Sequence, residues 1–242
     1  MSAGQRRIRL SPRLQAAVDM LEDCPVIADV GCDHGRTAVA LLQQGRCECV
    51  IATDISAPSL EKARRLAKYV GVDGSIDFRT GDGFAAIKAG ECDAVMILGM
   101  GGELIAGILD ACPLPLMGAG RVVMQPMRGQ EELREYLYSH GYWIREDRLV
   151  REGRRCYQVL AAEPSKLVQE PPKGWPKDCF EVGFMSFLCR DPLLLDFVAE
   201  NLQRCERQLA EARGTEGEAV LNARCGRLKT IIKLWEDSYG TK

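Results

Sequence analysis

This sequence of 242 residues lacks the features that mark membrane and exported proteins. No apolar run approaches the ~18 residues that a membrane-spanning helix requires. The first residues, MSAGQRRIRLSPRL, contain arginines but no apolar core of the kind found in secretory signals. The formal net charge is only −2, so the chain lacks the basic excess common in nucleic-acid-binding proteins. We therefore expect a cytoplasmic globular protein that does not contact a membrane.

The chain also lacks the residue clusters that hold metal ions. It contains no C-x-x-C pair and only two histidines, His34 and His140. Its eleven cysteines are odd in number, and several lie inside expected strands or helices. A metal site would need clustered ligands, and a disulfide framework would favour paired cysteines outside such elements. These patterns predict reduced thiols and no bound metal.

Strand-like apolar runs alternate with helical patterns through the first 140 residues. Strands are expected at 26–30, 49–53, 75–80, 94–98 and 121–125. Helices are expected from Pro12 and at 37–44, 58–70, 102–112 and 131–140. Such alternation predicts βαβ units and a mostly parallel sheet with helices on both faces.

Two further strand-like runs, 144–150 and 156–162, are joined by a tight turn at Gly153. They predict an antiparallel pair at the edge of the parallel sheet. The expected fold is therefore α/β and Rossmann-like, with a mostly parallel seven-stranded sheet. This is the architecture of class I methyltransferases, although a fold does not assign a function by itself.

A second, smaller part is expected at the C-terminal end. Residues 164–178 contain four prolines and one glycine, which predicts a linker or an ordered loop. Beyond it, apolar residues recur at steps of four and three over 198–212 and again over 221–235. These two seams predict a coiled-coil-like helical hairpin. We expect one domain at 1–163 and a C-terminal helical hairpin domain at 164–242.

Acidic residues stand where the first three strands end. The first strand leads into Asp29-Val30-Gly31-Cys32-Asp33-His34-Gly35, the second ends in Asp54, and the third ends in Gly81-Asp82-Gly83. The carboxyl ends of parallel strands meet at one edge of a sheet, where ligands of this fold bind. Asp54 lies 23 residues after Gly31, a spacing that suits a carboxylate bound to ribose hydroxyls. Asp82 is expected to accept a hydrogen bond from an adenine amino group.

A carboxylate in the first turn, Asp33, argues against a phosphate-bearing cofactor. Dinucleotide turns surround an anionic pyrophosphate with bare backbone N–H groups, and this turn lacks the G-x-G-x-x-G spacing. S-adenosylmethionine carries a sulfonium and an ammonium group, which an acidic cleft favours. His34 is expected to orient Asp33. The simpler interpretation, in which these acids are helix caps and turn residues, remains open at this point.

Five short motifs carry a resemblance to a known family. DVGCDHG, ATDI, GDGF, LGMGG and QPM together resemble the bacterial tRNA (adenine-22-N1)-methyltransferases, known as TrmK. The resemblance extends from Ile8 to about Trp235. Three positions depart from the family pattern. Cys32 stands where serine is common, Asp54 stands in the place of a glutamate that would equally accept ribose hydroxyls, and Met127 replaces the asparagine of Q-P-N.

The resemblance implies methyl transfer from S-adenosylmethionine to N1 of an adenine, at position 22, in tRNA. It implies a catalytic role for Asp33, either near the positive charge that develops on the adenine or as a ligand of the cofactor's amino-acid tail. The implied cofactor-binding residues are Asp29, Gly31, Asp33, His34, Asp54, Ile55, Asp82, Gly83, Gly99 and Met100. The implied substrate-binding residues are Gly101, Gly102, Gln125, Pro126, Met127, Arg7 and Arg9.

The expected partner is tRNA, and the expected state is a monomer or a weak dimer. Two alternatives stay open. The first is a methyltransferase of a small molecule or a protein. The second is a catalytically silent RNA-binding homologue that keeps the fold.

Overall fold

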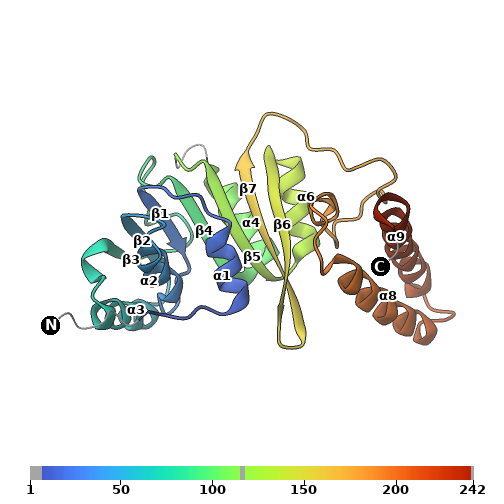
Figure 1. Ribbon diagram of the computed structural model, residues 1–242, viewed down its shortest axis with the longest axis horizontal. Helices are drawn as coiled ribbons and strands as arrows, with labels where there is room; N and C mark the ends of the chain where they lie inside the picture. Colours follow the sequence, from blue (N-terminus) through green and yellow to red (C-terminus); the bar gives the residue numbers. More distant parts are fainter. Residues whose placement is uncertain (1–6, 115–117, 241–242) are drawn as a thin grey trace. The chain divides into compact units, whose positions relative to one another are not determined.

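The computed structural model describes residues 7–114 and 118–240, and the chain divides into two compact units, Met1–Val168 and Gln169–Lys242. The first unit holds the sheet, and the second is helical (Figure 1). The predicted domain boundary after residue 163 stays a prediction, because compactness alone does not establish independent folding.

The first unit is built on a seven-stranded sheet with the order β3-β2-β1-β4-β5-β7-β6. Its first five strands are mutually parallel, whereas β7 pairs antiparallel with both β5 and β6. The predicted α/β fold with a mostly parallel seven-stranded sheet is confirmed. The strands are β1 (Val26–Val30), β2 (Cys49–Asp54), β3 (Ile76–Thr80), β4 (Ala94–Gly101), β5 (Arg121–Arg128), β6 (Tyr142–Glu152) and β7 (Arg155–Pro164).

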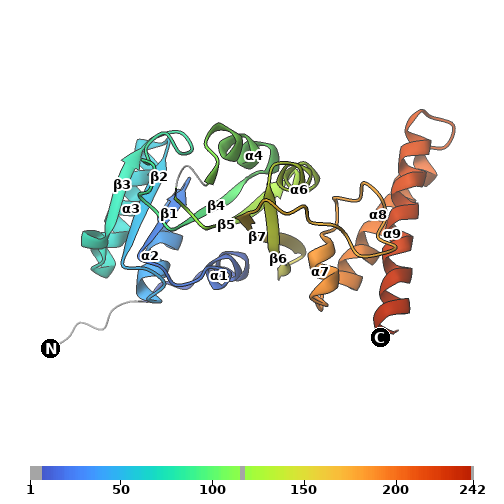
Figure 2. The same ribbon diagram turned by 90° about the horizontal axis from the view of Figure 1, so that it is seen from above.

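Helices cover both faces of this sheet. Figure 2 shows α1, α2 and α3 on one face, and α4 and α6 on the other. Their bounds are α1 (Pro12–Asp19), α2 (Arg36–Gln43), α3 (Ala57–Val70), α4 (Gly102–Ala111) and α6 (Gln130–Ser139), and a short 3-10 turn, η1, covers Asp73–Ser75. Local signals set the bounds of α3, because the Ser56 hydroxyl accepts a hydrogen bond from Ser59 N and Gly71 ends the helix in a left-handed conformation.

The core lies between the sheet and these helices. Central strand residues such as Ile27, Val50 and Met96 are fully buried, and the helices contribute Leu41 and Ala63. Both faces of β1 are covered, so it appears in the sequence as a continuous apolar run. This core fixes the strand ends, and therefore the side chains that follow them.

The fourth strand is longer than the sequence predicted. The expected strand ended at Leu98 and was followed by a flexible glycine turn, but β4 continues to Gly101. Its pairing with β5 shifts register around Gly99, which has a φ of +77°. This β-bulge lets the strand run on in spite of its glycines.

The second unit contains α7 (Phe184–Leu188), α8 (Leu194–Glu211) and α9 (Gly217–Tyr239). The two long helices form the predicted hairpin and lie side by side in Figure 1. Their seam buries Cys205 and Cys225, whose sulfur atoms are 2.7 Å apart. All eleven cysteines are unbridged in this structure.

Short helix α7 was not predicted. It joins an aromatic cluster in which Phe187 meets Trp175, Trp235 and Tyr239 with ring centroids 5.1–5.9 Å apart.

Within 7–114 and 118–240, no helix combines the length and the apolar character that a membrane span requires.

Candidate active site

A cavity of about 480 Å³ opens at the carboxyl edge of the sheet in the first unit. Its size lies within the roughly 300–1,000 Å³ typical of small-molecule sites. Residues at the ends of β1, β2, β4 and β5 line it, together with the loop after β3 and the first turn of α1. The cavity therefore lies where the chain order of the strands reverses, between β1 and β4.

The turn after β1 begins at a glycine against which the Met100 side chain packs. Gly31 has a φ of +71°, and a Cβ atom there would lie 2.0 Å from Met100 Cε, so a larger residue would displace Met100. Two backbone bonds tie this turn to β2, from Gly31 N and Cys32 N to Thr53 O, at 2.8 and 2.9 Å. These contacts fix the turn at the cavity wall.

Asp33 adopts a left-handed backbone with a φ of +47°, which is uncommon for a residue other than glycine. The Asp54 carboxylate holds it there, accepting a bond from Asp33 N at 2.9 Å and one from Ser56 N at 2.8 Å. The Asp33 side chain is 70% exposed, so its carboxylate is presented at the mouth of the cavity. Its position is consistent with contact to a ligand.

His34 connects Asp33 to a residue that the sequence did not point to. Its Nδ1 lies 3.1 Å from Asp33 Oδ2, and its Nε2 lies 3.1 Å from the ammonium of Lys62 on α3. A neutral ring that donates from Nδ1 to the carboxylate accepts from the ammonium at Nε2. This arrangement supports the predicted orienting role of His34.

Asp29 is the most deeply buried acid of the site. It is 2% exposed, and its Oδ2 has no hydrogen-bond partner among the described residues. Burial raises the pKa of this carboxyl to about 7, although the backbone N–H of Ala38 opposes the shift and Asp54 adds to it. Burial of the Cys32 side chain, together with the negative charge of Asp29, raises the pKa of the Cys32 thiol. A cationic group in the cavity would supply the partner that Asp29 lacks.

All ten residues predicted to bind the cofactor line this cavity: Asp29, Gly31, Asp33, His34, Asp54, Ile55, Asp82, Gly83, Gly99 and Met100. Three lining apolar side chains are also unusually exposed, with Ile55 at 72%, Leu104 at 55% and Met127 at 40%. Exposed apolar groups beside an acidic cavity suit a ligand with flat aromatic rings.

The residues predicted to bind substrate do not all line the same cavity. Met127 lines the cavity, whereas Gly101 and Gly102 line a neighbouring hollow of about 400 Å³ beside Arg128. Gln125 is fully buried, and Gln125 Nε2 donates to Pro126 O at 2.8 Å. The structure does not bring Gln125 and Pro126 to the cavity wall.

Arg7 and Arg9 are exposed and do not line the cavity, although Arg9 O accepts a bond from the Arg36 guanidinium. Sequence reasoning did not assign several residues that do line it, among them Arg13 and Arg36. Arg36 directly follows the DVGCDHG motif, so its position was a signal that could have found it, whereas Arg13 lies on α1, outside the motifs that carry the acids. Within 7–114 and 118–240, no cluster of three metal-ligating side chains is present.

The chain is similar to known proteins over most of its length. The model of the family described as "Methyltransferase domain" matches residues 10–160. A curated relative from Bacillus subtilis, tRNA (adenine(22)-N(1))-methyltransferase, is 36% identical over 156 residues. This match covers 64% of the chain and 66% of the relative, so the similarity spans slightly less than two thirds of that protein.

Solved structures extend the similarity to the second unit. The crystal structure of the B. subtilis M1A22 tRNA methyltransferase TrmK has a TM-score of 0.77 and 29% identity, covering 93% of this chain and 100% of that one. M. capricolum TrmK, solved with S-adenosyl-homocysteine, has a TM-score of 0.78 at 21% identity and covers 94% and 98%. The resemblance to TrmK that the motifs indicated is thereby confirmed.

Proposed function

Because the chain belongs to the family of methyltransferase domains, we propose that it is an S-adenosylmethionine-dependent tRNA methyltransferase that acts on N1 of an adenine. The observation that carries the proposal is the group of four aspartates that line the cavity, one of them buried with an unpartnered oxygen. Its similarity to the TrmK enzyme of B. subtilis supports tRNA as the substrate and adenine 22 as the position.

The lining residues fit a cationic, zwitterionic methyl donor. When bound, S-adenosylmethionine supplies a methyl group attached to a positively charged sulfur. Asp54 would accept hydrogen bonds from the ribose hydroxyls, because each of its oxygens has a lone pair beyond those used by Ser56 N and Asp33 N. Asp82 would accept from the adenine amino group, and Asp29 would pair with the ammonium. Ile55 and Leu104 would cover the adenine ring.

Methylation at N1 does not require the protein to remove a proton from the adenine. Neutral adenine has an in-plane lone pair at N1, so no base is needed to create the nucleophile. The methylated ring is cationic, and catalysis therefore depends on alignment and on negative groups near that ring. The exposed Asp33 carboxylate is suited to this role, because Asp54 holds the Asp33 backbone N–H and His34 contacts the carboxylate itself. Met127 and Gly101 would border the entrance for a base that is turned out of the tRNA.

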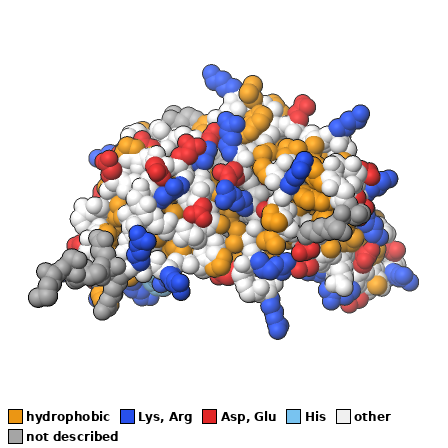
Figure 3. Space-filling view, viewed as in Figure 1, with side chains coloured by type: hydrophobic (Ala, Val, Ile, Leu, Met, Phe, Trp, Pro, Cys, Tyr) orange, Lys and Arg blue, Asp and Glu red, His pale blue; other side chains and the backbone are white. Residues whose placement is uncertain are grey.

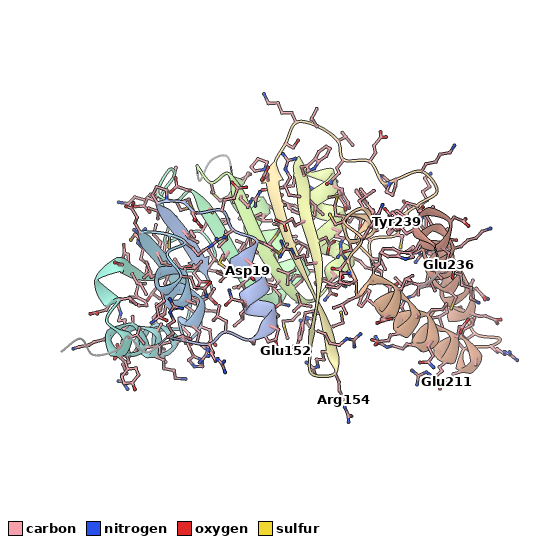
Figure 4. The ribbon with its side chains drawn as sticks, in the orientation of Figure 1. Asp19, Glu152, Arg154, Glu211, Glu236 and Tyr239 are labelled. Carbon is pink, nitrogen blue, oxygen red and sulfur yellow. The ribbon has the colours of Figure 1, made fainter. Side chains whose placement is uncertain are left out.

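The tRNA would be held by basic side chains at the edge that carries the cavity. β6 runs in the same direction as β5, so the turn between β6 and β7 projects beyond the carboxyl edge. Figure 4 shows Arg154 at the tip of this hairpin, with its side chain extending away from the sheet. Figure 3 shows acidic and basic side chains interspersed over the visible face, so binding would depend on local contacts and be sensitive to salt. Arg7 and Arg9 are further candidates.

The test is incubation of the protein with an unmodified tRNA transcript and methyl-deuterated donor, followed by nucleoside mass analysis. We expect deuterated 1-methyladenosine from the natural chain and a loss of rate on the order of 100-fold for Asp33→Asn. Asparagine tolerates a left-handed backbone, so this variant removes the charge with little strain.

Asp178→Asn is the matched control. Asp178 also has a positive φ, +55°, but it does not line the cavity. Methylation of a different nucleoside would refute the substrate assignment, and an unchanged rate for Asp33→Asn would remove that residue from its role.

A further inference from the structure

The charged groups of the cavity are separated along the carboxyl edge of the sheet. The acids stand on one side, because Asp29 and Asp54 lie at the carboxyl ends of β1 and β2, and Asp82 lies in the loop after β3. The guanidinium of Arg13 stands on the other side, where it contacts Gln125 of β5. The sheet order β3-β2-β1-β4-β5 keeps these two groups apart. The cavity therefore offers a ligand negative charge at one end and positive charge at the other.

Arg13 is held firmly although it lies in the first turn of α1. Its Nη1 donates to Gln125 Oε1 at 2.6 Å, and its Nε lies 3.8 Å from Glu152 Oε2 of β6. Its guanidinium carbon lies 5.4 Å from the ring centroid of Tyr157 on β7. The side chain is 22% exposed, so most of it is removed from water. A guanidinium has five N–H groups, and the bond to Gln125 uses one of them.

Gln125 has an unusual environment for a residue predicted to touch substrate. It is fully buried, and its Nε2 is bound to Pro126 O at 2.8 Å and lies 3.6 Å from Met127 Sδ. These contacts fix the orientation of the amide, so that its oxygen points to Arg13. The glutamine is therefore placed to position the arginine.

We propose that Arg13 binds the carboxylate of the methyl donor's amino-acid tail, and that Gln125 is a positioning residue that acts through Arg13. The inference rests on the proposed function. In the proposed function, Asp54, Asp82 and Asp29 account for the hydroxyl, amino and ammonium groups of such a donor, but its carboxylate needs a cation. The planar fork of arginine matches a carboxylate with two parallel hydrogen bonds.

Arg36 is the other guanidinium among the described residues that line the cavity. It is exposed at the first position of α2, and its Nη2 donates to Arg9 O. This bond of Arg36 goes to a backbone carbonyl of an exposed residue, whereas Arg13 is bound to the buried side chain of Gln125. Arg36 therefore serves as the matched comparison.

The test compares two ligands by calorimetry on the full chain: S-adenosylmethionine and its decarboxylated form, S-adenosylmethioninamine. The second ligand lacks the carboxylate and carries one more net positive charge. An acidic cavity without a carboxylate partner would bind it more tightly. With Arg13 in its proposed role, the natural chain prefers the carboxylated ligand by on the order of 10- to 100-fold.

The variants separate the two arginines. Arg13→Gln should abolish or reverse the preference, Arg13→Lys should keep part of it, and Gln125→Ala should weaken it. Arg36→Gln should retain it. Circular dichroism tests whether each variant is folded. If Arg13→Gln does not fold, the partial loss of preference expected for Arg13→Lys still tests the inference.

Equal or tighter binding of the decarboxylated ligand to the natural chain would overturn the inference, as would a preference lost in Arg36→Gln and kept in Arg13→Gln. Failure of the natural chain to bind either ligand would instead refute the proposed function.

Discussion

The buried carboxyl of Asp29 makes a quantitative link between pH, stability and ligand binding. Asp29 is the second-last residue of β1, with 2% exposure and an Oδ2 that has no partner among the described residues. Burial raises its pKa from 3.8 to about 7. The folded chain therefore holds a proton that the unfolded chain releases between these two values.

The sign of the effect follows from this difference. Between about pH 4 and pH 7 the folded state binds more protons than the unfolded state, so the free energy of unfolding falls as pH rises. Each pKa unit corresponds to about 1.4 kcal/mol, and a shift of about three units gives about 4 kcal/mol. This contribution is fully present below the unfolded pKa and is lost as pH rises through the folded pKa.

Asp29→Asn removes the charge and nearly preserves the shape. Near pH 5 the unfolded natural chain has already released this proton, so the variant should be more stable by roughly 1–2 kcal/mol. Near pH 8 the folded natural chain has lost the proton too, and the variant should be more stable by about 4 kcal/mol. Urea denaturation at both pH values measures this difference, and other titrating groups cancel in the comparison.

Ligand binding should favour the charged form of Asp29, whereas folding favours its protonated form. A cationic donor stabilises the charged carboxylate, so binding near pH 6 should release up to about one proton, measured by calorimetry in buffers of different ionisation enthalpy. Asp29→Asn should release none and bind the donor more weakly. A stability difference that is the same near pH 5 and pH 8, or binding without proton release, would refute the reasoning.

Three further outcomes are expected. Asp147→Ala should lower the free energy of unfolding by about 3–5 kcal/mol in urea, because it deprives the buried guanidinium of Arg134 of its carboxylate; a loss under about 1 kcal/mol would contradict this. Gly31→Ala should weaken donor binding at least ~10-fold in calorimetry, because a side chain is strained at its positive φ; unchanged affinity would argue against the close approach. Arg154→Gln with Arg155→Gln should reduce the slope of log affinity for tRNA against log salt by about 2, while donor affinity stays constant; an unchanged slope would exclude the hairpin tip from the interface.

Local sequence predicted those parts of the fold that local physics determines. Strand β1 was expected at 26–30 and lies at Val26–Val30, because a doubly covered strand needs an unbroken apolar run. The glycines after Leu98 favoured a turn, but tertiary pairing with β5 carries β4 on to Gly101. Helix α7 is a single turn stabilised by aromatic contacts from α9, so no periodic pattern announces it.

The acids of the site were predictable because each stands directly at a strand end. Gln125 was expected to end its strand, but β5 continues to Arg128, and the Gln125 side chain is fully buried and does not reach the cavity. Position along a strand does not determine which of its side chains reach a ligand when both faces are covered. Arg13 and Lys62 reach the site from α1 and α3, so their roles depend on contacts that only the fold creates.

A crystal structure with S-adenosyl-homocysteine tests the central claim most directly, namely that the acidic cavity at the carboxyl edge holds the methyl donor. We predict density for the ligand in this cavity, with ribose hydroxyls on Asp54, the adenine beside Asp82 and the tail between Asp29 and Arg13. A ligand bound elsewhere, or aspartates turned away from it, would contradict the account.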